Sequence, residues 1–273
     1  MSKTVLICGA SGGLGQVMGE MFVQKGLQVF GTMRAPEKSN ESFSFPMVAM
    51  DATDETSVAN CLAEVQQQAG KIDVIINCFN NMILGSVEET SIDEYKHLYD
   101  VNLFGVVRVC KAAIPLMRAQ GSGTIINMSS AGGILAVPYL SAYTSAKFAI
   151  ETFTEALYHE LKKEPIDVVI MQPVAMHMDR PETGHHLGAV AGADANSPTH
   201  KMIKQMAKDT AASTLTPEMV SEKIYSVIHA KKKKLRYPMD RAVMLGRIKR
   251  FAPQSTIDKL IGGLVASAMK QPA

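Results

Sequence analysis

The fold of this chain is decided by one stretch near its start, Thr4-Val5-Leu6-Ile7-Cys8-Gly9-Ala10-Ser11-Gly12-Gly13-Leu14-Gly15. Its first five residues are apolar or β-branched and predict a buried strand, and the glycines predict a sharp turn into a helix. Such a turn directs backbone N–H groups and the positive end of a helix toward one spot, which suits a pyrophosphate. Taken alone, the turn also fits plain packing of a helix on a strand.

Short apolar runs alternate with longer helical patterns along the chain, which is typical of a parallel sheet covered on both faces. The predicted strands are residues 4–8, 28–33, 46–50, 73–77, 123–128 and 167–171, with a late strand near 235–238. The predicted helices are residues 13–25, 55–69, 91–118 and 141–163, followed by one from 217 to about 231. The sequence therefore predicts an α/β fold, a single doubly wound domain with a parallel sheet of seven strands.

We expect residues 1–240 to form this domain and residues 241–273 to add a helical C-terminal extension to it. Residues 176–215 break the alternation, since they are rich in His, Gly, Ala, Asp, Pro and Met. We interpret them as a mobile segment that covers the substrate at the carboxyl edge of the sheet. Its apolar side chains would line an apolar pocket or, alternatively, anchor a surface helix to the core; they are Met176, Met178, Leu187, Val190, Met202, Ile203 and Met206.

Composition argues against several classes of protein. With 28 Lys and Arg against 26 Asp and Glu, the chain lacks the positive charge expected of a nucleic-acid-binding protein. No apolar run reaches the roughly 18 residues of a membrane span, and the start lacks a cleavable signal, so we expect a cytoplasmic protein. The four cysteines have neither a CxxC pair nor metal-binding spacing, so we expect reduced thiols and no metal site.

A second set of residues points to proton transfer. Tyr143 and Lys147 stand four apart in a helical pattern, so their side chains share one face. An ammonium beside a phenol favours the phenolate and lowers its pKa, which suits acid–base work near neutral pH. Simple packing or solvation also explains such a pair. The catalytic interpretation of the pair becomes stronger in view of Asn127-Met128-Ser129-Ser130. Ser130 ends a predicted strand there and is placed to hold a substrate oxygen.

Together these residues resemble the short-chain dehydrogenase/reductase family. The resemblance runs from Thr4 to about Ile170 and rests on Gly9-x3-Gly13-x-Gly15, Asp51, Asn102, Ser129-Ser130 and Tyr143-x3-Lys147. It implies a Rossmann fold, an oxidoreductase with a nicotinamide cofactor, and a homodimer or homotetramer. The extension, with Leu235-Arg236-Tyr237-Pro238 and residues 247–253, resembles hydroxysteroid and retinol dehydrogenase-like members; a generic tail or subunit contact is the alternative.

The resemblance also implies a role for each site residue. Tyr143 would act as the general acid or base, and Ser130 would orient the substrate carbonyl or hydroxyl. Lys147 would bind the nicotinamide ribose and lower the pKa of Tyr143, and Asn102 would hold a water in the proton relay. The residues implied to bind the cofactor are Gly9, Ser11, Gly13, Leu14, Gly15, Arg34, Asp51, Ala52, Asn77, Tyr143, Lys147, Pro173 and Val174.

Three positions depart from the family pattern. The loop after the fourth strand usually reads Asn-Asn-Ala-Gly and here reads Asn77-Cys78-Phe79-Asn80, so we expect Asn80 to take the left-handed backbone of the replaced glycine. Val174 replaces the glycine of a Pro-Gly pair, and Met178 stands where a threonine would meet the nicotinamide carboxamide. These changes bear on nicotinamide positioning and leave the proton-transfer groups intact.

The end of the second predicted strand indicates which cofactor is used. NAD-dependent relatives place a carboxylate there, which binds the adenosine ribose and would repel a 2′-phosphate. Here that position is Met33, and the next is Arg34, whose guanidinium can pair with phosphate. We therefore expect NADP(H), with surface solvation as the alternative explanation of Arg34.

The sequence thus predicts an NADP(H)-dependent oxidoreductase that reduces a ketone or aldehyde on a bulky apolar substrate, or oxidises the matching alcohol. The alternative from another class is an NADP(H)-binding sensor without turnover, which the altered loops favour. Peripheral membrane contact through Lys231-Lys232-Lys233-Lys234 is compatible with either, and its plain explanation is solvated charge at a helix end.

Overall fold

The structure is a computed structural model that describes residues 2–40, 42–178, 185–187, 194 and 196–270. Seven parallel strands form its main sheet, in the order β3-β2-β1-β4-β6-β7-β9. They are β1 (Thr4–Cys8), β2 (Gln28–Met33), β3 (Met47–Ala49), β4 (Val74–Asn77), β6 (Gly123–Met128), β7 (Ile166–Gln172) and β9 (Arg236–Pro238). Strand order reverses between β1 and β4, which confirms the predicted doubly wound arrangement.

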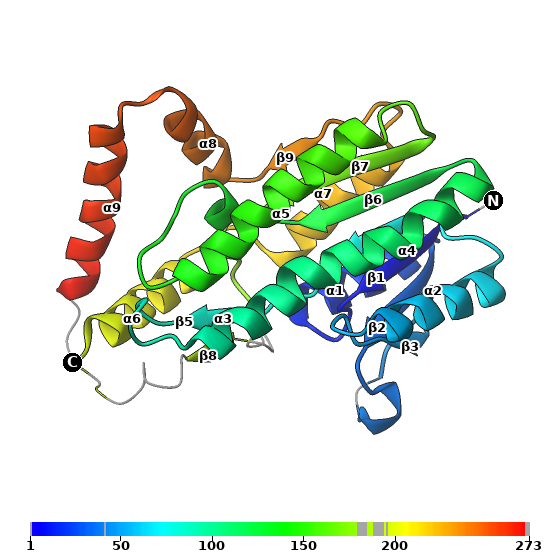
Figure 1. Cartoon of the computed structure of the whole chain (residues 1–273), viewed down its shortest axis with the longest axis horizontal. Helices are drawn as coiled ribbons and strands as arrows, with labels where there is room; N and C mark the ends of the chain where they lie inside the picture. Colours follow the sequence, from blue (N-terminus) through cyan, green and yellow to red (C-terminus); the bar gives the residue numbers. More distant parts are fainter. Residues whose placement is uncertain (1, 41, 179–184, 188–193, 195, 271–273) are drawn as a thin grey trace.

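Helices cover both faces of this sheet (Figure 1), as the apolar strands require. On one face lie α2 (Glu55–Ala69), α4 (Gly105–Gln120) and α5 (Ser141–Glu160), and on the other lie α1 (Gly13–Gln24) and α7 (Pro217–His229). Local sequence sets the helix ends. Asp54 caps the first turn of α2. Thr216 caps α7 just before Pro217, the residue at which the sequence predicts this helix to begin.

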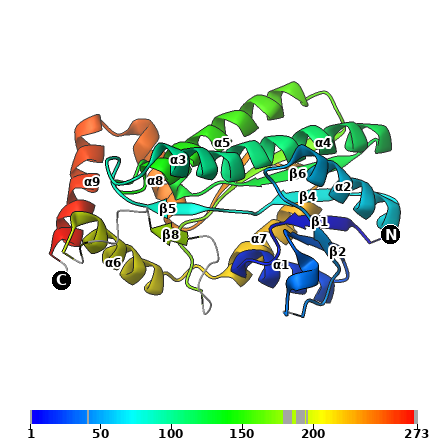
Figure 2. The same ribbon diagram turned by 60° about the horizontal axis from the view of Figure 1, so that its bottom comes forward.

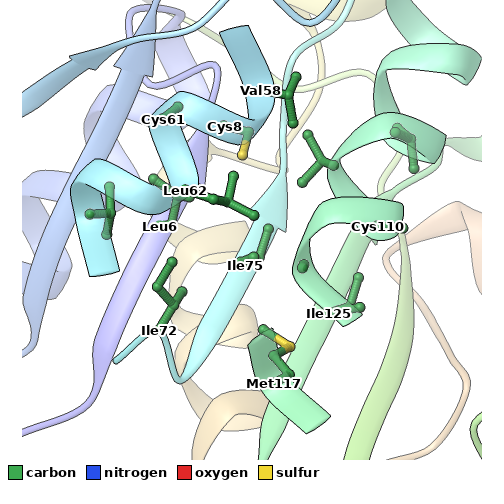
Figure 3. Packing of buried hydrophobic residues seen from close by; sticks show 14 of the residues in the cluster. Leu6, Cys8, Val58, Cys61, Leu62, Ile72, Ile75, Cys110, Met117 and Ile125 are labelled. Carbon is green, nitrogen blue, oxygen red and sulfur yellow. The ribbon is translucent and has the colours of Figure 1, made fainter. Parts of the chain in front are cut away.

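Alternate residues of each strand enter two separate cores. In β1, Leu6 and Cys8 face α2 and α4, whereas Val5 and Ile7 face α1 and α7. Figure 3 shows the first of these cores, where side chains of three neighbouring strands pack against α2 and α4. Burial on both sides explains why the strands appear in the sequence as unbroken apolar runs.

Three of the four cysteines belong to the core of Figure 3. Cys8, Cys61 and Cys110 are buried there, Cys78 is half-buried just after β4, and none of the four is in a disulfide. Burial raises the pKa of Cys61 and Cys110 to about 12 and holds that of Cys8 well above its ordinary value. These three thiols therefore pack as small apolar groups.

Residues 176–215 contain more regular structure than predicted. A helix, α6 (Pro198–Ala211), begins after its cap Ser197, and β8 (His185–Leu187) pairs in parallel with β5 (Met82–Leu84). The sequence analysis placed no strand here and gave a surface helix only as an alternative, because strands of three residues give no readable period and α6 is mostly polar. Met202 is buried on the inner side of α6, whereas Val190 lies outside the described residues.

The predicted helix over residues 91–118 is continuous but irregular. It consists of α3 (Ile92–Tyr99), a π-helical turn (Asp100–Phe104) and α4. A π-turn interrupts the regular hydrogen-bond ladder of a helix and is often found at functional sites. Asn102 lies in this turn and is wholly buried.

The predicted helical extension is present as α8 (Arg241–Phe251) and α9 (Gln254–Met269). In Figure 1 and Figure 2, both helices lie at the end of the molecule opposite the N-terminus, where α9 runs beside α6. The Ser267 hydroxyl of α9 donates a hydrogen bond to Gln205 Oε1 of α6, at 3.4 Å. Among the residues described, no helix is both long enough and apolar enough to span a bilayer.

The burial of the thiols predicts selective alkylation. At pH 8, iodoacetamide should modify Cys78 and spare Cys8, Cys61 and Cys110. A pKa of about 12 leaves only about one thiol in ten thousand ionised, and only the thiolate reacts. Peptide mass spectrometry reads the modified positions. The Cys78→Ser protein should take up reagent only after denaturation, and rapid labelling of any buried thiol in the folded protein would contradict the described packing.

Candidate active site

The carboxyl ends of the strands bring together residues that are far apart in the sequence. The glycine-rich turn begins at Gly9 after β1, Arg34 follows β2, Asn77 ends β4, Ser130 follows β6, and Pro173 follows β7. Since all these strands are parallel, the five positions share one edge of the sheet. They flank the reversal of strand order between β1 and β4, which is where open α/β sheets bind ligands.

Close packing requires glycine at two positions of the turn after β1. Gly9 has a φ of +88°, and a Cβ there would lie 2.7 Å from the backbone nitrogen of Phe79. A Cβ on Gly15 would lie 2.5 Å from the Gly9 carbonyl oxygen. Gly12 precedes α1 and offers no side-chain cap, so the first N–H groups of the helix are available to an anion.

Met178 lies over the middle of this turn. Its Cε atom is 2.0 Å from the place that a Cβ on Gly13 would take. A diphosphate at the N-terminus of α1 would compete with the thioether for this space. The three rotatable bonds of methionine allow the side chain to move aside.

Ser130, Tyr143 and Lys147 come together beyond β6. Ser130 caps the 3-10 turn Ala131–Gly133, where its Oγ accepts a hydrogen bond from the Gly132 N–H at 3.2 Å. The Tyr143 ring packs on the same turn, because a Cβ on Gly132 would lie 3.2 Å from its Cε1. Lys147 Nζ, one helical turn along α5, lies 5.5 Å from the centroid of that ring. The structure thus assembles the predicted trio.

Lys147 is held inside the protein although it carries an amine. Its side chain is only 2% exposed, and Nζ donates a hydrogen bond to the Met128 carbonyl oxygen at 3.0 Å. The Ala131 N–H donates to the Pro173 carbonyl oxygen at 2.8 Å, which ties the end of β7 to the Ser130 turn. Burying an amine is unfavourable unless it is hydrogen-bonded, and the Met128 carbonyl oxygen supplies such a bond to Lys147.

Asn102 fixes the loop that follows β4. The Asn81 N–H donates to Asn102 Oδ1 at 2.7 Å, and Asn102 Nδ2 donates to the Asn81 carbonyl oxygen at 2.6 Å. The side-chain amide is therefore engaged with the loop backbone, and the implied water-holding role stays a prediction.

The expectation that Asn80 takes a left-handed backbone was wrong. In the described part of the chain, only Tyr139 and Asp240 combine a side chain with positive φ.

A buried chain of amides, which the sequence analysis missed, links β4, β6 and α5. Asn77 Nδ2 donates to Asn127 Oδ1 at 2.8 Å, and Asn127 Nδ2 donates to the Thr154 hydroxyl at 3.0 Å. The available signal was a polar Asn127 inside an otherwise apolar strand. This chain of hydrogen bonds fixes the Asn77 side chain at the end of β4.

Four buried polar atoms near this edge have no hydrogen-bond partner within the described chain. They are Ser129 Oγ and the Oδ1 atoms of Asn77, Asn80 and Asn81. Buried polar groups are nearly always hydrogen-bonded in folded proteins. Their presence fits an edge that receives a polar ligand.

The ends of β2 and β3 carry opposite charges. Asp51 Oδ1 accepts hydrogen bonds from the Thr53 N–H at 2.9 Å and its hydroxyl at 2.7 Å. The bond from the Thr53 backbone is the main cause that lowers the pKa of Asp51, and the guanidiniums of Arg34 and Arg108 add to it. Arg108 also donates to the Ala52 carbonyl oxygen at 3.0 Å, whereas Arg34 is exposed.

The remaining residues predicted to bind the cofactor differ in which of their atoms a ligand could reach. Ser11 is half-buried in the glycine-rich turn, and Val174 packs against the core of α1 and α7. Leu14 faces the same core, so its backbone rather than its side chain is available to a ligand. Across the described ranges, no group of three or more His, Cys, Asp or Glu is arranged to hold a metal ion.

Comparisons with known proteins agree with this geometry. The profile of the short chain dehydrogenase family matches residues 3–183. The chain is 37% identical to a 3-ketodihydrosphingosine reductase of Bacteroides thetaiotaomicron over 171 residues, 63% of each chain. It is 30% identical to an NADPH-dependent 3-dehydrocapnine reductase of Ornithobacterium rhinotracheale over 182 residues, 63% of this chain and 64% of the relative. Both matches span less than two thirds of these relatives.

Among solved structures, a short-chain dehydrogenase from Streptomyces avermitilis is similar over nearly the whole chain. The two proteins share 26% identity with a TM-score of 0.77, over 97% of this chain and 96% of the other. The similarity therefore includes the C-terminal helices beyond the matched family profile.

Proposed function

This chain belongs to the short-chain dehydrogenase family, and from that premise we propose that it is an NADP(H)-dependent oxidoreductase that interconverts a carbonyl and an alcohol. The observation that carries the proposal is the buried Lys147 amine beside the Tyr143 ring, with the Ser130 turn against the same ring. This grouping suits general acid–base catalysis on a substrate oxygen.

In the direction of reduction, each of the three side chains has a separate task. Bound NADPH would supply the hydride that reaches the carbonyl carbon. The Ser130 hydroxyl donates a hydrogen bond to the carbonyl oxygen, and Tyr143 delivers a proton to that oxygen as negative charge develops. Lys147 then stabilises the phenolate, which regains a proton from solvent; we propose that Asn102 holds a water on this route.

Several features of the edge fit a phosphorylated dinucleotide. The uncapped start of α1 suits a diphosphate, and the close packing at Gly9 and Gly15 places it against β1. Arg34 is exposed just after β2, where Met33 leaves no carboxylate to repel a 2′-phosphate. The NADPH dependence of the Ornithobacterium relative supports this choice. Further proposed contacts are Ser11, Gly13, Leu14, Asp51, Ala52, Asn77, Pro173 and Val174.

We propose a bulky apolar ketone or aldehyde as the substrate. The two named relatives are reductases of a 3-keto and a 3-dehydro compound, which supports reduction of a carbonyl. Half-buried Met176 and Met178 follow β7 at the site edge, and their thioethers offer an adaptable apolar wall. Within the proposed domain of residues 1–240, residues 176–215 would cover the substrate.

A sensor that binds NADP(H) without turnover is the second candidate. Met178 favours it, because its side chain lies over Gly13 in place of the polar residue that the family pattern expects. Incubation of the protein with NADPH and a panel of apolar ketones separates the two candidates. Only an enzyme would oxidise NADPH and so lower the absorbance of its nicotinamide band.

Removal of the phenol tests the mechanism. Tyr143→Phe should lower kcat by at least about a hundredfold, because the proton donor is lost while the ring is kept. NADPH binding, measured by fluorescence titration, should persist. Tyr158→Phe, a matched change on the same helix, should leave kcat close to that of the wild type. Near-normal turnover of a folded Tyr143→Phe protein would refute the assignment.

Exchange of the residues after β2 tests cofactor choice. Met33→Asp combined with Arg34→Ala should shift preference toward NADH, since it removes a phosphate partner and adds a repulsive carboxylate. Titration of all four dinucleotides measures the shift. Arg118→Ala removes an exposed guanidinium elsewhere and should change nothing. If the wild type binds NADH as tightly as NADPH, the role given to Arg34 is wrong.

A homologous series of ketones tests the substrate class. Each added methylene should raise kcat/KM about fourfold until the pocket is filled, because burial of a methylene contributes about 0.8 kcal/mol. A flat series, or a preference for small keto acids, would reject the apolar pocket. Such a result would leave the oxidoreductase proposal untouched.

A further inference from the structure

Positive charge is concentrated in one segment of the chain. Residues 231–270 contain eleven of the 28 Lys and Arg but only two of the 26 Asp and Glu. This segment therefore carries a net charge of +9, whereas 17 Lys and Arg against 24 Asp and Glu give the rest of the chain −7. Such asymmetry within one chain is typical of proteins that meet an anionic surface.

The cations of this segment fall into two groups. Lys233 pairs with Asp167 at 2.9 Å, and Arg236 pairs with Glu151 at 3.0 Å, so these two hold the segment to the sheet and to α5. Helix α8 is different: it contains no acidic residue, and its cations Arg247, Lys249 and Arg250 are exposed. None of these three forms an ion pair with another described residue.

Apolar side chains share one side of α8 with Arg247, and Arg250 borders that side, whereas Lys249 lies on another side of the helix. Phe251 is 77% exposed, Met244 52% and Val243 38%. At about 100° per residue, these three and Arg247 fall within a sector of about 100°, on the side away from the buried Ala242. We call the four residues Val243, Met244, Arg247 and Phe251 the outer face of α8.

In the part of the chain that the structure describes, this face stays largely open to the surroundings. Figure 1 and Figure 2 place α8 and α9 at the edge of the molecule, with α9 beside α6. The outer face therefore presents Arg247, with Arg250 at its border, together with large apolar groups to the surroundings.

We propose that the outer face of α8 docks on a lipid bilayer that contains anionic lipids. Interfacial helices combine cations with exposed aromatic and aliphatic side chains, which enter the headgroup region while the cations bind lipid phosphates. A twofold contact between copies would oppose two segments of charge +9 and is disfavoured. A nucleic-acid backbone would engage the cations but leave Val243 and Met244 in water. The inference does not depend on the proposed catalysis.

Vesicle binding of the full-length protein, without cofactor or substrate, tests the proposal. At low salt the protein should sediment with phosphatidylcholine–phosphatidylglycerol vesicles at least about tenfold more strongly than with phosphatidylcholine alone. Binding should weaken at ~0.5 M salt, where charges are screened. Equal binding to both vesicles, or to neither, overturns the proposal.

Paired variants separate the two contributions. Arg247→Gln with Lys249→Gln and Arg250→Gln should lower vesicle binding about tenfold or more, as should Met244→Ser with Phe251→Ser. The matched controls are Lys38→Gln with Lys162→Gln and Lys163→Gln, and Val87→Ser with Ile92→Ser; all five are exposed elsewhere and should have no effect. Unchanged binding of both α8 variants overturns the proposal.

A spectroscopic readout remains available if a multiple variant does not fold. The sequence contains no tryptophan, so Phe251→Trp introduces a single fluorophore on the outer face. Its emission should shift to the blue on anionic vesicles and be quenched by brominated lipid, whereas Val87→Trp should show neither change.

Two other outcomes would favour the rival partners. If Phe251→Ser changes the molecular mass that sedimentation measures without vesicles, the outer face binds a second copy of the chain. Duplex DNA that binds the wild type and Phe251→Ser equally well, and displaces vesicles, assigns it to nucleic acid. Either result overturns lipid docking.

Discussion

The contact between the turn after β1 and the loop after β4 is the constraint on which the rest of the site depends. The absence of a side chain at Gly9 lets the backbone of Phe79 approach, and the absence of one at Gly15 lets α1 start directly above the turn. Both contacts lie where strand order reverses. A bulkier turn would separate α1 from β4. It would also move the uncapped N-terminus of α1 away from Asn77 and Asn81.

The proton-transfer side is held to the same edge by polar groups inside the protein. Glu151, one turn beyond Lys147 on α5, accepts hydrogen bonds from Gln172 of β7 and Arg236 of β9, each at 3.0 Å. Because the Glu151 carboxylate is buried, loss of either partner would leave its charge less well compensated, so this group helps to fix the position of α5 along the sheet. The same strand β9 leads into α8, so the catalytic helix and the basic extension share an anchor.

Most of the fold could be predicted from the sequence because its signals are local. The strands of residues 4–8 and 28–33 agree with β1 and β2 because unbroken apolar runs mark strands buried on both faces. What could not be predicted depends on distant partners. β5 is a strand only because β8 lies beside it, and Asn80 needs no left-handed backbone because Asn102 clamps the neighbouring Asn81. Tyr143 and Lys147 were recognisable since one helix sets their spacing.

Net charge shows how a chain average can hide the arrangement of a surface. A total of +2 argues against an anionic partner when the charges are mixed evenly, but here it is the sum of a basic segment and an acidic remainder. Screening limits each exposed charge to a range of about 10 Å, so a partner at α8 meets Arg247, Lys249 and Arg250 and not the distant carboxylates. The exposed Phe251 and Met244 then decide which anionic partner fits, because apolar side chains gain free energy only where the partner also excludes water.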